Sequence, residues 1–565
     1  MHTKDDTFIK TKNLRRNEDI IILSGDKDKS CVILNKQDYI HKIENLINEG
    51  IAQGKYTSTT DNTLKELSSF QTFLQNHFKK HEKYDEMRPT TNQPGRLFAT
   101  AKTHKFSSLE EIDLEQLKLR PIIDQTGSCY YKAGKVIAEY LKPLSQNEFV
   151  IIDTQSFPDL IKNTPISDDE EDVSYDVESL FTNIPVRETI DYILDQIYNQ
   201  HKLKPMCKKS IFKKLLYKLT TECTFSANNS LYKQVDGVTM GGPLSVVFTG
   251  CFMNKMEQDV VVPLKPKFYK RFVDDTYSRR KKGVKDELFD ALNSYHKNIR
   301  LTIEVNPEKF LDTNIVREGS KPVEFKVYDN VNKVPFHWSS KVPKKYKRGI
   351  IIGELHRAIR ISTNFDVEIK RIYDKFIKAG YPYNFIKSIV SSYDQKKEEL
   401  LIPDWLFPES KKEIYFRVPY CPKNEQEIYS VIRKLEQFTN NEYQIKIIWN
   451  TTKLRSLFKI KDKTLHQSNV IYEGECTCNA KYIGETERNA QTRWSEHNSN
   501  DGKSRPSKHL IDNPTHEFSW RILSIAPRDY KKRKILEAYY IRSKMPNLND
   551  QLDIKTLYLF RNGIT

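Results

Sequence analysis

The sequence predicts a multidomain α/β protein. With 565 residues, the chain exceeds the size of one hydrophobic core and should divide into roughly three or four domains. Between about Gly95 and Trp338, short runs rich in β-forming residues alternate with helical patterns. A second strand, loop, strand, helix pattern begins near Val470, after a polar connector. These observations favour α/β domains arranged in series along the chain.

The composition is basic. Lysine and arginine number 92 against 75 aspartates and glutamates, which gives a formal net charge of +17. Such a balance favours a polyanionic partner, with nucleic acid ahead of a membrane surface. The eight cysteines are mostly isolated, which argues against a disulfide framework and indicates a reducing compartment. Apolar runs stay well below the roughly 20 residues of a membrane span, and the N-terminus is polar, so we expect a soluble intracellular protein.

The elements follow in order. Helical spacing dominates the first 95 residues, as at Tyr39–Ile51 and Leu64–Phe78. The following segment should contain strands at Leu119–Asp124, Val173–Val177, Leu231–Lys233, Phe268–Tyr277 and Leu301–Val305. Residues 341–440 turn basic and helical, with several prolines. The predicted divisions are 1–95, 96–340, 341–440, a linker over 441–469, and 470–565.

Carboxylates stand on two of these β-rich runs. Asp176 lies in Tyr-Asp-Val-Glu-Ser-Leu-Phe, and Asp274 and Asp275 lie in Arg-Phe-Val-Asp-Asp-Thr. Phosphoryl transfer requires mainly that metal ions be held against the attacking and leaving oxygens. An aspartate pair alone is more often part of a turn or a solvated edge. We expect Asp274 to join Asp176 at the metals, with Asp275 in support at the turn of a hairpin.

Further residues suit a nucleotide. Phe181 follows Asp176 by five positions and could exclude a 2′-hydroxyl, although a core phenylalanine is the simpler interpretation. The loop from Gln234 to Gly241 opens a helix, and its glycines permit close backbone approach. The cations Lys102 and Arg120 suit a triphosphate.

In their order along the chain, these segments resemble the motifs of reverse transcriptases, and within them those of the Penelope-like retroelements. The matching segments are Asp176–Pro185, Met240–Ser245, Val273–Asp275 and Phe310–Asp312. The resemblance implies a right-hand polymerase with fingers, palm and thumb, two Mg²⁺ ions, deoxynucleotides and an RNA template. The thumb would include Trp338–Arg348 and Gly380–Pro382. Asp26-Lys27-Asp28 resembles the family's Asp-Lys-Gly segment but lacks its glycine.

The last unit resembles a GIY-YIG endonuclease. Its two short strands carry Val470-Ile471-Tyr472 and Tyr482-Ile483-Gly484, with valine in place of the first glycine. The resemblance implies that Tyr472 assists deprotonation of the attacking water, Arg493 stabilises the phosphate charge and Glu537 holds one Mg²⁺. It also implies that Tyr482 and His497 complete the site, with Asn549 in support. Taken singly, each tyrosine would be read as a strand core residue.

A second metal site is predicted between and after these strands. Cys476, Cys478, His509 and His516 supply two thiolates and two imidazoles, as structural zinc requires. The cysteine spacing is tighter than usual and the histidine spacing wider. Cysteine and histidine residues stand at similar places in Penelope-like nucleases, which favours zinc; buried free cysteines are the alternative.

The resulting hypothesis is a retrotransposon reverse transcriptase that nicks target DNA and copies its RNA from the exposed 3′-hydroxyl. Its partners would be element RNA, target DNA and deoxynucleotides, and we expect it to act in the nucleus. One alternative is a telomerase-like polymerase that primes on existing DNA ends with an idle nuclease. Another is a non-catalytic nucleic-acid-binding remnant of a transposon. Retention of all three aspartates argues against the remnant.

Overall fold

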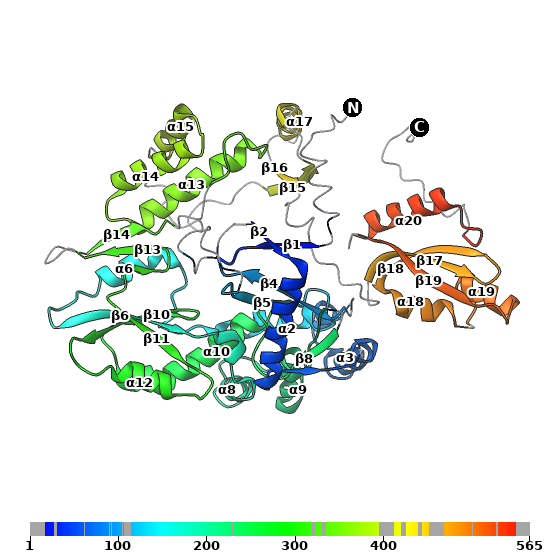
Figure 1. The fold of residues 1–565 in the computed structure, drawn as a ribbon, viewed down its shortest axis with the longest axis horizontal. Coiled ribbons are helices and arrows are strands. Elements are labelled where there is room, and N and C mark those ends of the chain that lie inside the picture. Colours follow the sequence, from blue (N-terminus) through cyan, green and yellow to red (C-terminus); the bar gives the residue numbers. More distant parts are fainter. Residues whose placement is uncertain are drawn as a thin grey trace.

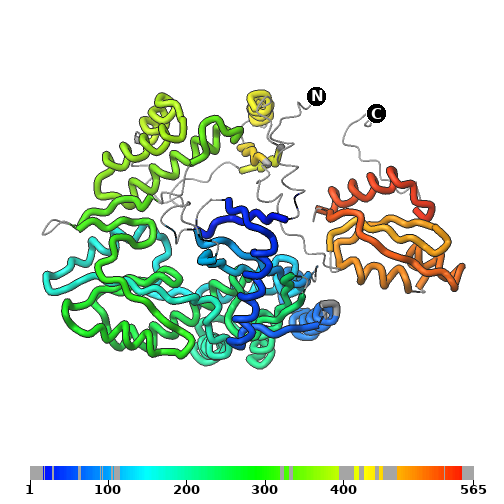
Figure 2. Tube along the Cα trace, viewed as in Figure 1, coloured from blue at the N-terminus to red at the C-terminus, as the bar shows by residue number. Residues whose placement is uncertain are grey.

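The computed structural model describes most of the chain (Figures 1 and 2). The described residues are 17, 19–27, 31–60, 63–89, 91, 93–103, 106, 113, 115–228, 230–317, 323–329, 335–394, 412–419, 425–438, 443–450, 468–499, 501–526 and 529–549. In this part of the chain, no helix is both long and apolar enough to cross a membrane.

The N-terminal region begins with a hairpin and continues into helices. Its elements are β1 (Ile20–Ser24), β2 (Cys31–Asn35), α2 (Lys36–Ala52), β3 (Tyr56–Ser58), α3 (Thr63–Phe78) and α4 (Tyr84–Met87). The Asn35 side chain caps α2, and the helix buries Tyr39, Ile43 and Ile47, which recur at the four-residue spacing of one helical face. The helical predictions for residues 39–51 and 64–78 are confirmed.

A five-stranded sheet joins this region to the next. Its order is β3, β8 (Ser230–Gln234), β7 (Thr224–Ala227), β4 (Gly95–Ala101) and β5 (Leu119–Asp124). Ile21, Leu34 and Tyr39 share one core with Leu97 and Phe225 of this sheet. The predicted boundary at residues 95/96 therefore falls inside one packed unit.

A four-stranded antiparallel sheet, which we call the central sheet, has the order β11 (Leu301–Val305), β6 (Glu170–Val177), β10 (Asp275–Lys281) and β9 (Tyr269–Phe272). Figures 1 and 2 show the cyan strand β6 between the green strands β10 and β11, although a long stretch of chain separates them. Within the β-rich run over 268–277, the chain reverses at Val273 and Asp274, so the predicted hairpin is confirmed.

Helices and a small sheet cover the two faces of this central sheet. Val173, Tyr175 and Val177 alternate along β6 and point into the largest hydrophobic core. The helices that cover this face of the sheet supply most of the other residues of that core. Its helices are α5 (Tyr131–Leu141), η2 (Lys142–Ser145), α7 (Leu180–Asn183), α8 (Val186–Tyr198), α9 (Lys209–Thr220), α10 (Ser245–Met256), the π-helical η4 (Glu257–Val261), α11 (Val262–Leu264) and α12 (Glu287–Ser294).

The opposite face packs Tyr277 against Phe157 and Phe310. The elements on this side are η3 (Thr154–Ser156), α6 (Phe157–Lys162), β12 (Lys309–Phe310), β13 (Thr313–Val316) and β14 (Glu324–Val327). Residues of β6 and β10 that pair across the two strands point to the same face, so Asp176, Asp275 and Tyr277 share it.

Three helices follow with a core of their own: α13 (Lys344–Ile361), α14 (Phe365–Lys378) and α15 (Tyr383–Asp394). Beyond them, β15 (Lys412–Pro419), α17 (Glu425–Phe438) and β16 (Tyr443–Asn450) form a parallel β-α-β unit. The predicted linker over 441–469 is therefore wrong for 443–450, because these residues form a strand. The alternate side chains Ile447 and Trp449 of that strand are buried. Its positions 451–467 lie outside the described residues.

The C-terminal unit is a three-stranded antiparallel sheet with helices on both sides. Its elements are β17 (Ser468–Cys476), β18 (Lys481–Asn489), α18 (Ala490–His497), α19 (Arg505–Asp512), β19 (Phe518–Ile525) and α20 (Tyr530–Lys544). The central strand is β17. Val470 and Tyr472 contribute to one small core, and Ile471 and Ile483 to the other. The prediction of a multidomain α/β fold with a small C-terminal α/β unit is confirmed.

Candidate active sites and metal centre

Three carboxylates meet at one end of the central sheet. Asp176 near the end of β6 lies directly opposite Asp275 at the start of β10. Asp274 belongs to the two-residue turn that joins β9 to β10. Like charges placed directly opposite each other in a sheet are destabilising without a compensating cation. The arrangement therefore has the chemistry of a divalent-cation site.

The electrostatics of Asp275 agree with this interpretation. Desolvation, together with the neighbouring Asp274 and Asp176 carboxylates, raises the pKa of Asp275 to about 6. Lys27 acts in the opposite direction and lowers the pKa of Asp275. A carboxyl group that its anionic neighbours make harder to ionise is a natural ligand for an added cation. A bound cation at this end of the sheet would relieve the repulsion among the three carboxylates.

The turn differs from its predicted form. We expected Asp275 at the turn, but Val273 and Asp274 occupy it, and Asp275 is the first residue of β10. Val273 adopts a left-handed conformation with φ of 59°, which is rare for a β-branched residue. All three acids nevertheless remain at the same end of the sheet.

A buried ion pair stabilises this turn. The Arg271 side chain is almost fully buried and pairs with Glu257, which has no exposed surface. One Arg271 Nη atom donates to the Val273 carbonyl oxygen at 3.1 Å, and the other donates to Asn254 Oδ1 at 2.9 Å. This network was not predicted from the sequence. Its one signal was a cation directly before the acidic motif.

Loss of this pair should weaken both stability and polymerase activity. Arg271→Met would leave Glu257 buried without its cation, and we expect a cost of about 3 kcal/mol or more in folding free energy. Thermal denaturation checks this. Adding Glu257→Gln should recover most of that stability, because no charge then stays buried. Primer extension should remain low in the double variant, since the Val273 carbonyl oxygen still lacks its donor. Full recovery of extension would contradict the supporting role.

The predicted nucleotide-binding residues lie on connected segments. The Ile123 N–H of β5 donates to the Met240 carbonyl oxygen at 2.9 Å, and the Val238 N–H donates to the Phe181 carbonyl oxygen at 2.8 Å. Gly241 has a φ of 114°, and a Cβ there would lie 2.7 Å from the Ile123 carbonyl oxygen. Glycine is therefore required at position 241 for this loop to pack against β5.

The remaining candidates extend this surface. Phe181 is half-buried and packs against the main core. The rest of its side chain is accessible to solvent. Gln234 is buried at the end of β8. Arg120 on β5 forms an ion pair with Asp26, with 3.1 Å between Nε and Oδ2. The Lys102 N–H donates to the Lys118 carbonyl oxygen, which sets Lys102 on the segment beside Arg120.

A buried tyrosine organises the C-terminal unit. The Tyr472 hydroxyl lies 2.8 Å from His497 Nε2, and His497 Nδ1 lies 2.8 Å from Ser504 Oγ. Burial and the nearby Arg493 lower the pKa of His497 to about 4, so the imidazole is neutral at pH 7. A neutral ring donates through one nitrogen and accepts at the other, so one of the two hydroxyls, Ser504 or Tyr472, accepts from His497 and the other donates to it.

The other predicted residues surround this pair. Burial raises the pKa of Tyr472 well above its usual value, Tyr482 and Glu537 add to the rise, and Arg493 opposes it. Burial also raises the pKa of Glu537, although Lys534 lies 2.8 Å away and opposes it. The structure thus brings Tyr472, Tyr482, Arg493, His497 and Glu537 into one cluster. A partly desolvated carboxyl in such a cluster is fit to hold one divalent cation.

Backbone contacts fix the second tyrosine strand. A Cβ at Gly484 would lie 2.5 Å from the Tyr472 hydroxyl oxygen, so only glycine leaves room for that hydroxyl. The Asn549 side chain donates to the Ile483 carbonyl oxygen and accepts from the Ile483 N–H, at 2.7 and 2.8 Å. Asn549 therefore holds the strand, as its predicted supporting position implies.

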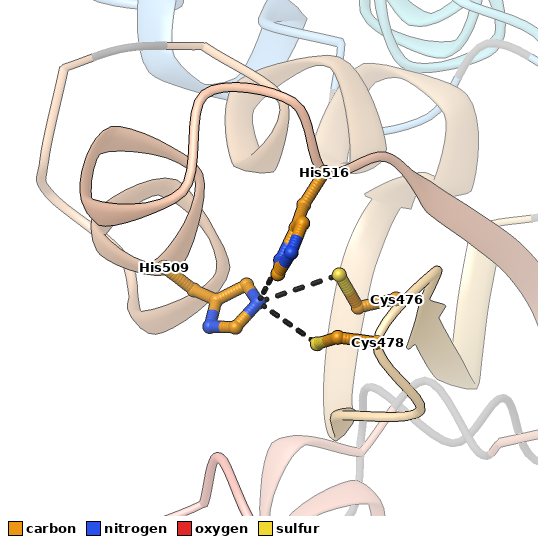
Figure 3. A group of neighbouring side chains, drawn as sticks. All are labelled: Cys476, Cys478, His509 and His516. Atoms are coloured by element: carbon orange, nitrogen blue, oxygen red, sulfur yellow. Dashed lines mark hydrogen bonds between the residues drawn. The ribbon is translucent and has the colours of Figure 1, made fainter.

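Two cysteines and two histidines form a compact group (Figure 3). His509 Nε2 lies 3.3 Å from Cys476 Sγ, 3.4 Å from Cys478 Sγ and 3.2 Å from His516 Nδ1. All four ligand atoms lie within 4.8 Å of one another. Zinc bond lengths imply tetrahedral edges of about 3.3 Å between nitrogens and about 3.6 Å between nitrogen and sulfur. The group is fit to hold one metal ion.

Comparison with known families decides the class of the C-terminal unit. Residues 468–549 match the model of the GIY-YIG catalytic domain, a range that contains β17 to α20 and Asn549. Residues 468–549 are a GIY-YIG domain. The cluster around Tyr472 and the Cys476 metal group both belong to it. The chain therefore carries a nuclease-type catalytic domain downstream of the aspartate site.

A second family model matches the three-helix unit. Residues 336–391, which include α13 and α14 and most of α15, match the animal helix-turn-helix domain. No curated protein matches the chain.

Several solved polymerases are similar in structure. A Candida albicans telomerase in complex with a TWJ fragment of telomeric RNA is 11% identical, with a TM-score of 0.43 over 68% of this chain and 67% of the telomerase. The Sicinivirus 3Dpol RNA-dependent RNA polymerase is 12% identical, with a TM-score of 0.32 over 55% and 70%. An insertion-loop deletion mutant of a human picobirnavirus RNA-dependent RNA polymerase is 9% identical, with a TM-score of 0.38 over 70% and 85%.

Proposed function

We propose that this chain is a retrotransposon reverse transcriptase that nicks its DNA target and extends the nicked strand along its own RNA. The observation that carries the proposal is the presence of two separate centres in one chain. One is the set of three aspartates on the central sheet, and the other is the GIY-YIG cluster around Tyr472. Neither centre alone accounts for both nicking and copying.

The central sheet would act as the palm of a right-hand polymerase. Asp176, Asp274 and Asp275 would hold two Mg²⁺ ions, which stabilise the charge on the transferred phosphoryl group. Phe181 would exclude a 2′-hydroxyl, and Arg120 and Lys102 would contact the triphosphate. The loop at Gln234 and Gly241 would support the template and the nucleotide.

The three helices α13 to α15 would act as the thumb. Lys344, Lys345 and Arg348 are exposed at the start of α13 and suit contact with a phosphate backbone. Lys347 differs, because its Nζ donates to the Ser340 carbonyl oxygen at 2.7 Å and lies over the Trp338 ring. It would stabilise the fold of the thumb, and the three exposed cations would grip the template and primer.

The GIY-YIG domain would supply the primer end. Tyr472 would act as a hydrogen-bonded hydroxyl beside the neutral His497, and the two would position and deprotonate the attacking water. Arg493 would stabilise the phosphate charge. Glu537 would hold one Mg²⁺, which lowers the pKa of bound water. Because its target would be chromosomal DNA, we propose that the protein acts in the nucleus.

One assay tests the whole proposal. Purified protein, its element RNA, supercoiled plasmid, deoxynucleotides and Mg²⁺ should yield nicked plasmid with complementary DNA joined to the nick. Complementary DNA joined only to added free DNA ends, without nicking, would favour the telomerase-like alternative. Binding of both nucleic acids without any chemistry would favour the non-catalytic remnant.

We further propose that the Cys476 group holds structural zinc. The protein should then contain about one zinc per chain, and chelation should lower the stability of the GIY-YIG domain, because metal binding contributes to folding. Elemental analysis and thermal denaturation measure these quantities. Cys478→Ser should lose the metal, whereas Cys31→Ser, at an exposed cysteine outside the group, should keep it. Folded protein without zinc would leave free cysteines as the better interpretation.

A further inference from the structure

The imidazole of His497 is held on several sides in the GIY-YIG domain. Its Nε2 lies 2.8 Å from the Tyr472 hydroxyl oxygen, and its Nδ1 lies 2.8 Å from Ser504 Oγ. The Trp520 ring stacks on it, with 5.2 Å between the ring centroids and 16° between the ring planes. A Cβ at Gly474 would overlap the Trp520 ring, so only glycine leaves that ring its place. Contacts to both ring nitrogens and to one face therefore fix the orientation of the imidazole.

Ser504 reaches His497 from a different helix. It is the N-cap of α19, and its hydroxyl oxygen accepts from the Ser507 N–H at 3.3 Å. The Ser507 side chain has no exposed surface, and its Oγ donates to the Ser499 carbonyl oxygen and accepts from the Gly502 N–H. These bonds close the loop between α18 and α19 and hold Ser504 against His497.

The direction of the two imidazole hydrogen bonds follows from Tyr472. Its side chain is 1% exposed, so its hydroxyl proton needs an acceptor inside the protein. In the part of the chain that the structure describes, the hydrogen-bond partners of this hydroxyl are His497 and Arg493. A guanidinium only donates, so the Tyr472 proton points to His497 Nε2. Because the imidazole is neutral, its own proton is on Nδ1 and points to Ser504 Oγ.

We propose that Ser504 is a positioning residue of the nuclease, which keeps the proton of His497 on Nδ1 and leaves Nε2 free to accept from Tyr472. The inference rests on the proposed nicking function. As Tyr472 takes a proton from the attacking water, its own proton passes to His497 Nε2, and the water becomes the hydroxide that attacks phosphorus. The imidazolium then donates to both hydroxyl oxygens, and Ser504 accepts before and after the transfer. Ser504 thus acts through His497 and does not touch the substrate.

A simpler role for Ser504 would be to cap α19 alone. Substitutions separate the two roles, because glycine and aspartate are both accepted at the N-cap of a helix. Ser504→Gly keeps a start for the helix but removes the acceptor from His497. Ser504→Asp keeps the cap and the acceptor and adds a negative charge beside the imidazole. Ser504→Thr keeps the hydroxyl and adds only a methyl group.

The first measurement is the nicking rate of the full chain on supercoiled plasmid with Mg²⁺. Ser504→Gly should slow nicking about tenfold, as expected for the loss of one orienting hydrogen bond. Ser504→Thr should restore most of the rate. Primer extension by Ser504→Gly should equal that of the parent protein, because the central sheet is unchanged, and thermal denaturation should show that the variant is folded.

The pH profile of nicking gives a second readout, which a cap alone would not change. The charged and titratable side chains that face His497 are Arg493, Glu496, Asp501, Tyr472 and Tyr482. Ser504→Asp would favour the imidazolium and raise the pKa of His497 from about 4. Only the neutral imidazole can accept from Tyr472, so the acid limb of the profile should move to higher pH. Ser543→Asp adds the same charge at an exposed position of α20 and should leave the acid limb unchanged.

The outcomes separate this inference from the proposed function. Nicking by Ser504→Gly at the parental rate would overturn the positioning role, and so would a Ser504→Asp profile that coincides with the parental one. If thermal denaturation shows that glycine loosens the domain, the Ser504→Asp profile decides by itself. If the parent protein does not nick plasmid at all, the nuclease assignment fails and this inference fails with it.

Discussion

Asp176→Ala is expected to abolish primer extension on RNA while plasmid nicking continues at the parental rate. Asp176 faces Asp275 across two paired strands, and removing it takes a ligand from the proposed metal site. Loss of a metal ligand should cost far more than tenfold in rate, which corresponds to about 1.4 kcal/mol of barrier. Extension with radiolabelled deoxynucleotides measures the first activity, and conversion of supercoiled to nicked plasmid measures the second.

Glu304→Ala provides the matched control. Glu304 is an exposed carboxylate on β11 of the same sheet, and it pairs in register with Ser174. Its removal changes the net charge equally and should leave extension unchanged. Asp274→Ala and Asp275→Ala should behave like Asp176→Ala. Extension by Asp176→Ala within tenfold of the parental value would mean that these carboxylates are not the metal ligands.

Tyr472→Phe and Glu537→Ala should stop nicking of intact duplex. The first change removes the hydroxyl that lies 2.8 Å from His497 Nε2, and the second removes the proposed metal ligand. Extension of a supplied primer should survive, because the aspartates of the central sheet are untouched. Insertion should therefore fail on intact plasmid and return on plasmid that already carries a nick.

The pre-nicked plasmid makes this experiment decisive. Tyr539→Phe serves as a control, since Tyr539 is an exposed tyrosine on α20, the helix that carries Glu537. It should nick and insert normally. If Tyr472→Phe and Glu537→Ala both insert into intact plasmid as well as the parent protein, the GIY-YIG domain does not supply the primer. The telomerase-like alternative would then describe the chain better.

The features that could be predicted from the sequence are those encoded by contiguous residues. The strands at 119–124 and 301–305 have the predicted bounds, because local β-propensity and burial agree there. The cluster around Tyr472 was predicted through the resemblance to GIY-YIG endonucleases, because β17, β18, α18 and α20 supply its side chains from separate parts of the sequence. The cysteine and histidine spacing looked irregular only because a turn and a separate helix supply the ligands.

The features that were missed depend on contacts between distant segments. Nothing in the local pattern around Glu257 shows that a buried arginine from β9 pairs with it. The position of Asp275 depended on one detail, which is whether the hairpin turn takes Val273 and Asp274 or the next pair of residues. The pairing of Asp26 with Arg120 required the N-terminal hairpin and the five-stranded sheet to be placed in space.

The five-stranded sheet has a consequence for synthesis of the protein. Tyr56 of β3 pairs with Gln234 of β8, so the N-terminal strands cannot complete their sheet until the later segment has left the ribosome. At about 5–20 residues per second, that wait lasts on the order of ten seconds or more. The unpaired edges of these strands are exposed meanwhile, and a chaperone is expected to shield them. The GIY-YIG domain, whose strands lie close together in sequence, can fold as soon as it emerges.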